Sequence, residues 1–309
     1  MKFTSRTKKL LLLAVFAVVL ISAAGCAVPH DENNQVIYIW NEALDNGYTY
    51  RTSFSDVMAN ENWFSAIFVW PLAWLINQLS GPIGVGGAIA LVTIAVNAIL
   101  AAATMKSSIA QQQMQLVQPE MERIQRKYEG RDDETSKMRQ AQEMQALYRK
   151  YDINPASVLL VTFLQFPVII AMYMSVHRSW AVQSGTFLGM SLQSTPMAGI
   201  QQLLKGDMSG IGYLILFIVM GASQFFSMKL PEIIKKKKEA EKPSKHKGQE
   251  KNQNQFMQYY MLVMIMVFGL MWPAAMSLYW AINSLVQIVK TLITQKIIDD
   301  RQAKGGARA

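Results

Sequence analysis

The sequence predicts an all-α, polytopic membrane protein with five membrane-spanning helices. Hydrophobic residues make up 51% of the 309 residues, and they gather in apolar runs that carry few or no charged side chains. Most of these runs approach the roughly 20 residues with which an α-helix crosses a bilayer. Lys and Arg are concentrated between the runs, as is typical of the cytoplasmic loops of membrane proteins.

Residues 1–25 have the composition of a signal peptide. Basic residues lie within the first nine positions, and the apolar run that follows is short for a span. Ala23, Ala24 and Gly25 then precede Cys26, the single cysteine of the chain, in a pattern that resembles a bacterial lipoprotein cleavage site. The resemblance implies cleavage after Gly25 and lipidation of Cys26, palmitate included, on the outer face of the membrane. An ordinary signal peptide or an uncleaved anchor beside a bystander cysteine is the alternative.

The next two segments are expected on the outer side. Residues 26–62 are polar and lack a helical period, which predicts an exposed outer linker. Residues 63–81 are apolar, are interrupted by Pro71 and contain three tryptophans, which favour the membrane–water interface. We therefore expect a helix in the outer headgroup layer, with a kinked sixth span as the alternative.

The first span is expected over residues 83–105, which carry no charge. Thr93 and Asn97 lie four residues apart in its middle, and Thr104 and Ser108 continue the same helical face. Lipid offers no hydrogen-bond partner, so this polar stripe must face protein or water.

A cytoplasmic helical hairpin is expected over residues 106–154. Apolar residues recur at three- and four-residue steps on both sides of a turn around Gly130, and the other faces are densely charged.

Four further spans are expected beyond the hairpin, and the last two are joined by only Trp272 and Pro273. The predicted segments are span 2 at 156–178, an outer loop at 179–208, span 3 at 209–228, a basic cytoplasmic loop at 229–255, span 4 at 256–272, span 5 at 274–294 and a basic cytoplasmic tail at 295–309.

The distribution of Lys and Arg predicts the orientation. Residues 106–154 contain nine of them, residues 229–251 another nine and the tail four, whereas the outer segments contribute only Arg51, Lys205 and Arg178 at an edge. The basic segments are therefore expected in the cytoplasm, and five spans place the amino terminus outside. This bias accounts for much of the net charge of +9, so we expect no specific nucleic-acid binding.

Polar side chains recur inside the predicted spans. One such residue per helix is typical of hydrogen bonds between helices, whereas several stripes at similar depth indicate a shared wet groove. Both interpretations are open at the residues concerned: Thr93, Asn97, Gln165, Gln224, Trp280, Asn283, Ser284 and Gln287.

Residue patterns that support catalysis are missing from the sequence. It contains one cysteine and three histidines without metal-ligand spacing, and it has no Gly-rich phosphate loop. No acidic residue lies inside any predicted span, and the basic ones are Lys290 in span 5 and His177 and Arg178 at the end of span 2, which disfavours ion-coupled transport. We therefore expect no enzyme, no cofactor and no metal.

Several motifs together resemble the YidC/Oxa/Alb family of membrane protein insertases. They are the stretches 104–128, 154–176 and 271–290, supported by the aromatic stretch 68–81. The resemblance implies five core spans around a hydrophilic groove that is open to cytoplasm and lipid and closed to the outside. It also implies a cytoplasmic hairpin, nascent membrane proteins as clients, and the Sec translocon and ribosome as candidate partners. The lipoprotein start resembles the short form of bacteria with one membrane.

One position departs from the family pattern. Asn97 stands where an arginine usually sits in the groove, and that arginine is thought to attract acidic residues of the incoming segment. An amide can donate and accept hydrogen bonds but carries no charge. The alternatives to an insertase are an assembly scaffold for other membrane proteins and, less favoured, a small-solute channel or transporter.

Overall fold

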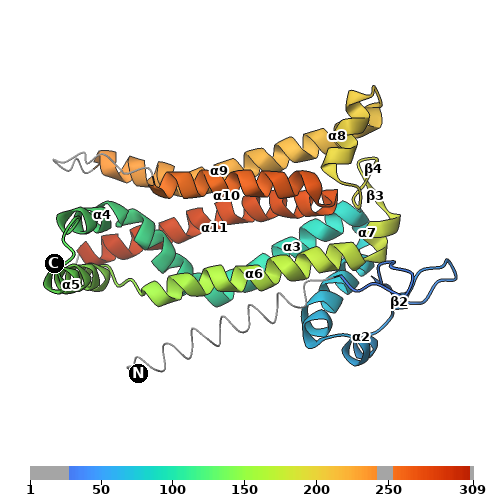
Figure 1. The fold of residues 1–309 in the computed structure, drawn as a ribbon, viewed down its shortest axis with the longest axis horizontal. Helices are drawn as coiled ribbons and strands as arrows, with labels where there is room; N and C mark the ends of the chain where they lie inside the picture. Colours follow the sequence, from blue (N-terminus) through green and yellow to red (C-terminus); the bar gives the residue numbers. More distant parts are fainter. Residues whose placement is uncertain (1–27, 242–252, 307–309) are drawn as a thin grey trace. The chain divides into compact units, whose positions relative to one another are not determined.

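The computed structural model describes residues 28–241 and 253–306 (Figure 1). The chain forms two compact units. Unit 1 comprises Met1–Ala95, Phe163–Met220 and Met266–Ile282, and unit 2 comprises Val96–Thr162, Gly221–Ile265 and Asn283–Ala309. The lipidation site predicted at Cys26 lies outside the described residues.

The predicted outer segment of unit 1, residues 28–62, is folded, although we expected residues 26–62 to be an exposed linker. Strands β1 (Tyr38–Ile39) and β2 (Tyr50–Arg51) pair in parallel, and helix α2 (Phe54–Asn60) follows. The Ser53 side chain caps α2 by accepting a hydrogen bond from the amide of Asp56. Ile39 and Val57 are fully buried, so the segment is not an exposed linker. The expectation was wrong because strands and helices this short leave no helical period in the sequence.

An aromatic cluster holds this outer segment together. The ring centroids of Tyr38, Tyr48 and Tyr50 lie 5.3–5.5 Å from that of Trp180. The centroids of Tyr38 and Tyr48 lie 5.4 Å from each other. Edge-to-face pairs at such distances are favourable beyond their buried area. Burial raises the pKa of Tyr38 to about 12, so the cluster stays neutral under ordinary conditions.

A buried arginine joins the outer segment to helix α6 (Pro155–Arg178). Arg178, the last residue of α6, is fully buried, and its guanidinium donates hydrogen bonds to both carboxylate oxygens of Glu61 at 2.8 and 2.6 Å. Its Nε also donates to the carbonyl oxygen of Ile37 at 2.9 Å. A buried charge needs such a partner, because desolvation otherwise disfavours it strongly.

Helix α3 (Trp70–Leu116) begins after a π-helical turn, η1 (Ser65–Val69), and is broken at Gly84. Gly84 has φ +73° and ψ 163°, a conformation that side-chain-bearing residues rarely adopt. The break lies two residues after Pro82, close to the predicted boundary between the interfacial helix and the first span. The position of either part relative to a bilayer stays a prediction.

The predicted outer loop at residues 179–208 is also folded. It contains helix α7 (Trp180–Ser184), the antiparallel strands β3 (Thr186–Phe187) and β4 (Met190–Ser191), helix α8 (Pro196–Leu204) and a short 3₁₀ turn, η2 (Met208–Gly210). The first amides of helix α11 (Ala274–Gly306) donate to this loop, from Ala274 to the oxygen of Ser194 and from Ala275 to that of Leu192. These bonds satisfy helix-start donors that have no partner within the helix.

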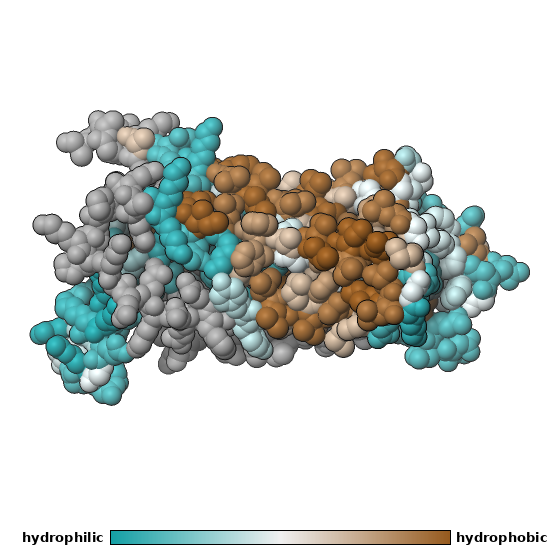
Figure 2. Space-filling model, turned by 90° about the horizontal axis from the view of Figure 1, so that it is seen from above, coloured by the Kyte–Doolittle hydropathy of each residue, from teal (hydrophilic) through white to brown (hydrophobic). Residues whose placement is uncertain are grey.

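Three helical stretches are long and apolar enough to cross a membrane within the described residues: Ser65–Leu116, Met208–Lys237 and Ala274–Asp300. Helix α9 (Ile211–Glu241) supplies most of the second stretch and extends beyond its end, while helix α10 (Gln253–Met271) contains a shorter apolar helix, Gln258–Met271. Large hydrophobic side chains such as Ile215 and Val263 are exposed, and Figure 2 shows a broad hydrophobic field on one face. Such a surface fits contact with lipid, and the fold class is an all-α membrane protein as predicted.

Unit 2 contains a helical hairpin of α4 (Gln118–Lys127) and α5 (Glu134–Lys150), which lie side by side in Figure 1. Gly130, with φ +78°, lies in the turn between them. Two sets of side-chain hydrogen bonds, which we call latches, connect the two helices. Glu143 accepts from Lys127 and from the Tyr128 hydroxyl, and Glu120 accepts from Lys150 and from the Tyr151 hydroxyl.

Candidate functional site

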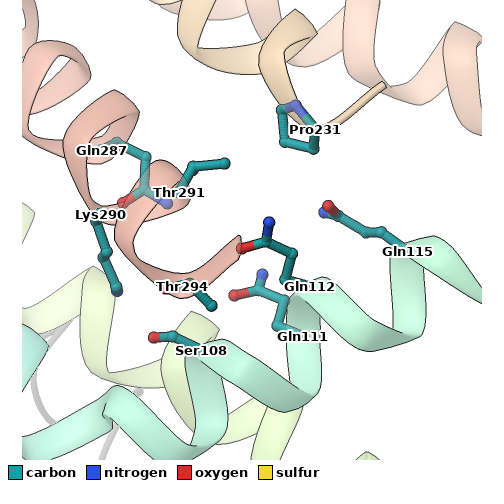
Figure 3. Close-up of a pocket in the computed structure, with 9 residues that line it drawn as sticks. All are labelled: Ser108, Gln111, Gln112, Gln115, Pro231, Gln287, Lys290, Thr291 and Thr294. Atoms are coloured by element: carbon teal, nitrogen blue, oxygen red, sulfur yellow. The ribbon is translucent and has the colours of Figure 1, made fainter. Parts of the chain in front are cut away.

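A polar pocket lies within unit 2, between side chains of α3, α9 and α11 (Figure 3). Its cavity of about 60 Å³ has room for roughly four or five water molecules. The lining residues are Ser108, Gln111, Gln112, Gln115, Pro231, Gln287, Lys290, Thr291 and Thr294. No carboxylate is among them.

Helical spacing explains how the sequence builds this pocket. On α3 the lining residues recur at three- and four-residue steps from Ser108 to Gln115, and on α11 they recur likewise from Gln287 to Thr294. Residues at these spacings share one helix face. Figure 3 shows the two sets of side chains facing each other across the pocket.

A chain of hydrogen bonds starts at the lining residue Gln112. Gln112 Nε2 donates to Gln295 Oε1 at 2.7 Å, and Gln295 Nε2 donates to Asp299 Oδ1 at 2.8 Å. Gln112 and Gln295 are both buried, so this bond fixes α3 against α11.

Two hydroxyl groups at the pocket have no partner. Ser108 Oγ and Thr294 Oγ1 are buried and make no hydrogen bond to any described residue. A buried hydroxyl without a partner is costly, so both groups are suited to bind water or a polar guest. Lys290 is the single charged residue among the lining side chains.

The structure distributes the eight predicted groove residues over both units. Thr93, Gln165 and Trp280 belong to unit 1, whereas Asn97, Gln224, Asn283, Ser284 and Gln287 belong to unit 2.

In unit 1 the predicted residues have different environments. Thr93 is buried and its hydroxyl donates to the carbonyl oxygen of Ile89 at 2.7 Å, one turn earlier in α3. Trp280 is buried and stacked on Trp272 with ring centroids 5.4 Å apart. Gln165 is half-buried. Thr93 and Trp280 thus have packing roles in this structure, and the groove role of both stays a prediction.

In unit 2 the structure brings two predicted residues into contact. The Ser284 hydroxyl donates to Gln224 Oε1 at 2.6 Å, which links α11 to α9. Asn97 and Asn283 are half-buried, and Gln287 is exposed and is the one predicted residue that lines the pocket.

Most of the pocket was missed by the sequence-based prediction. Ser108, Thr291 and Thr294 lie on the polar stripes of the predicted spans but were not among the eight predicted groove residues. The polar lining residues that the prediction did not place on any stripe are Gln111, Gln112, Gln115 and Lys290. Continuing the stripe of residues 93–108 at the same three- and four-residue spacing reaches Gln112 and Gln115. The glutamine-rich run at 111–115 was assigned to the soluble hairpin instead.

The part of the chain that the structure describes contains no group of three His, Cys, Asp or Glu side chains arranged to hold a metal ion.

Comparison with known proteins identifies the family. The family model described as "60Kd inner membrane protein" matches residues 75–302. The "Membrane protein insertase YidC" of Oceanobacillus iheyensis is 30% identical over 235 residues, which cover 75% of this chain and 84% of that protein. This chain belongs to the YidC/Oxa/Alb family.

Other members of the YidC/Oxa/Alb family align over much of the chain. The "Membrane protein insertase MisCA" of Bacillus subtilis is 30% identical over 228 residues, covering 73% of this chain and 76% of that protein. A YidC of Alkalihalophilus pseudofirmus is 27% identical and covers 93% of this chain and 94% of that protein. A solved active YidC insertase gives a TM-score of 0.45 at 22% identity, over 77% of this chain and 49% of that one. The family model and the 30% identical relatives confirm the resemblance seen in the sequence motifs.

Proposed function

We propose that this protein is a membrane protein insertase and chaperone, which takes nascent hydrophobic segments into a hydrophilic groove and releases them into the bilayer. The observation that carries the proposal is a polar pocket between apolar helices. Many large hydrophobic side chains of these helices are exposed on their other faces. The relatives named above are called insertases, which favours this function over an assembly scaffold or a small-solute channel.

The physical task of an insertase is to lower a solvation barrier. Moving a charged residue to the bilayer centre costs at least about 2.5–3.5 kcal/mol on insertion scales. A wet pocket lined by amides and hydroxyls replaces part of the lost hydration, and burial of the client's apolar residues drives release into lipid. This sequence of events contains no chemical step, so it needs no catalytic residue, cofactor or nucleotide.

We assign client contact to the polar residues of the spans. In unit 2, Gln287 lines the pocket, while Asn97, Gln224, Asn283 and Ser284 extend the polar surface along α3, α9 and α11. Thr93, Gln165 and Trp280 would contact the client from unit 1.

We further propose a multi-pass protein of the cell membrane with five spans and a lipidated Cys26 on the outer face. The signal peptide ends at Gly25, and the hairpin, the basic loop and the tail face the cytoplasm. The clustered cations of the loop and tail suit contact with the ribosome, and the Sec translocon is a second candidate partner.

Depletion of the protein tests the function. A single-span client with a short outer tail is followed by protease protection of that tail after the protein is depleted and after it is restored. We expect the tail to stay accessible on the cytoplasmic side during depletion. Unchanged translocation of the tail would refute the insertase function.

A further inference from the structure

We propose that helix α8 and the turn η2 together form a membrane anchor that lies in the lipid headgroup layer beside the start of helix α9. We call these residues, 196–210, the α8 segment. The partner of its apolar surface is lipid. The proposal requires only that α9 crosses the membrane, so it is independent of the insertase function.

Exposed apolar side chains on the α8 segment are the first argument. Leu204 is 81% exposed and Met208 is 65% exposed, although both side chains are large and apolar. Among the side chains that the structure describes, no large hydrophobic one is more exposed than Leu204. Clustered exposed side chains of this kind mark a surface that contacts lipid or another protein.

Helical spacing sorts the side chains of α8 onto different faces. Gly199 is buried and marks the face that packs on the protein. Met197 and Leu204 are seven residues apart, so they share a second, apolar face that is exposed. Gln202 and Lys205 are exposed on a third, polar face. One apolar and one polar exposed face are typical of a helix that lies in the membrane–water interface.

Close packing fixes α8 across the start of α9. A Cβ atom added at Gly199 would overlap the ring of Tyr213, and one added at Gly210 would overlap the carbonyl oxygen of Gly199. The Tyr213 hydroxyl donates to the carbonyl oxygen of Ser191 at 2.9 Å, which holds the start of α9 on the folded loop. Figure 1 shows α8 running across the start of α9 instead of continuing its axis. Where α9 crosses the bilayer, α8 therefore lies along the membrane plane.

The apolar surface of the α8 segment continues into the exposed side of α9. Large exposed apolar side chains follow one another at steps of three and four residues: Leu204, Met208, Ile211, Ile215 and Ile218. The last three belong to α9, which lies mostly in a stretch that is long and apolar enough to cross a membrane. Lipid that covers this side of α9 also reaches the α8 segment, which favours lipid over a separate protein partner.

The charges of the α8 segment favour the headgroup layer over the hydrocarbon core. Lys205 directly follows Leu204, and Asp207 directly precedes Met208; all four side chains are exposed. At the interface the apolar side chains can enter the acyl region while the ammonium and carboxylate groups stay among phosphates and water. In this position the α8 segment fixes the depth at which α9 enters the bilayer.

The test measures the depth of two positions on different faces of α8. Leu204→Cys and Gln202→Cys variants of the full-length chain are made in a Cys26→Ala background, which removes the single natural thiol. Each carries the same small fluorophore and is reconstituted without a client into vesicles of phosphatidylcholine and phosphatidylglycerol. Quenching is measured with phosphatidylcholine brominated on its acyl chains and with iodide in the water. Gln202 is the matched control, because it is exposed on the same helix.

We expect the brominated lipid to quench the label at 204 several-fold more than the label at 202, and iodide to show the opposite order. Equal quenching of the two labels by each agent overturns the proposal. A label at 204 that neither agent reaches also overturns it, because the surface would then be covered by a second copy of the chain. Since no client is present, these outcomes do not depend on whether the protein inserts one.

A second measurement places a charge on the apolar face. A label at Met208→Cys reports lipid quenching in the presence of Leu204→Glu or of the control Gln202→Glu. Leu204→Glu should lower the quenching several-fold, because a carboxylate at this position must leave the acyl region. Gln202→Glu should leave it unchanged. Equal quenching in the two variants overturns the proposal, and the cysteine pair decides alone if Leu204→Glu does not reconstitute.

Discussion

Arg178 and Glu61, 117 residues apart in the chain, form a bidentate ion pair in the interior of unit 1. The Arg178 side chain is 0% exposed and that of Glu61 is 5% exposed, so water screens neither charge. The pair fixes the end of helix α6 to the folded outer segment, which supplies both Glu61 and the Ile37 carbonyl.

Removing one partner of this pair should destabilise the protein. We expect Glu61→Ala to lower the free energy of unfolding by about 3–5 kcal/mol, because the guanidinium is left buried and uncompensated. Thermal unfolding in detergent measures the change. The double variant Glu61→Leu/Arg178→Met should recover part of the loss, and Lys137→Gln, which removes the exposed pair with Asp132, should cause no measurable change. A Glu61→Ala variant as stable as wild type would contradict the buried pair.

Asn97→Arg should be tolerated and should favour clients with acidic outer tails. Asn97 is half-buried on α3, so a longer side chain has a route toward solvent. The initial insertion rate of an acidic client should rise relative to that of the same client with a neutral tail. Severe misfolding of Asn97→Arg would mean that this position is packed rather than wet.

Crosslinking should separate client contact from helix packing on α11. Gln287 is exposed at the pocket, whereas Trp280 is buried against Trp272. A photoreactive amino acid at 287 should therefore capture a stalled nascent chain several-fold more efficiently than one at 280. Efficient capture from 280 alone would place the client path in unit 1 instead.

The hairpin should loosen in acid. The hydrogen bond from Lys127, followed by that from Tyr128, lowers the pKa of Glu143 below its usual value of 4.5. Because the folded pKa is the lower one, the carboxylate stabilises the hairpin above pH 4.5, and this contribution is lost as the pH falls through the folded pKa. Spin labels at the exposed positions Gln125 and Gln142, in a Cys26→Ala background, should report a broader distance distribution only at these low pH values.

The matching variant is Glu143→Gln, which should broaden the same distance distribution already at neutral pH. Its hairpin should respond less to acid than the wild type, since the titrating group has gone. The second latch, between Glu120 and Tyr151, stays in place in both proteins and limits the opening.

Cys26→Ala should abolish incorporation of radiolabelled palmitate. The residue is the single cysteine of the chain, so no other thiol can replace it. Intact-mass measurement should find the wild type cleaved before Cys26 and acylated. An unmodified thiol in the mature wild-type protein would instead favour the ordinary signal peptide or anchor.

Helices were predictable here because their signals are local. The three- and four-residue period of the hairpin arms and the Trp272–Pro273 interruption are visible within a few turns, and α10 ends at Met271 while α11 begins at Ala274. The folded outer segment depends on contacts such as Arg178 with Glu61 and Tyr38 with Trp180. Partners so far apart in the chain leave no periodic trace, so residues 26–62 resembled a linker.

The candidate site was predicted only in part for a related reason. Gln287 and the contact between Ser284 and Gln224 follow from polar residues in apolar runs, which stand out by contrast. Gln111, Gln112 and Gln115 lie in a glutamine-rich run that is polar in any case, so composition alone does not distinguish a pocket wall from a solvated helix end. Only the pairing of α3 with α11 reveals the difference.

A lipid on Cys26 would hold the folded outer segment close to the membrane. The carbonyl of Pro29 already accepts a hydrogen bond from the Ile37 amide, and Pro29 lies three positions after Cys26. Three residues reach at most about 11 Å. Acyl chains at Cys26 would then be a short membrane anchor that limits the distance between this segment and the bilayer surface. Lifting the segment further would draw acyl carbons into water at about 0.8 kcal/mol for each methylene.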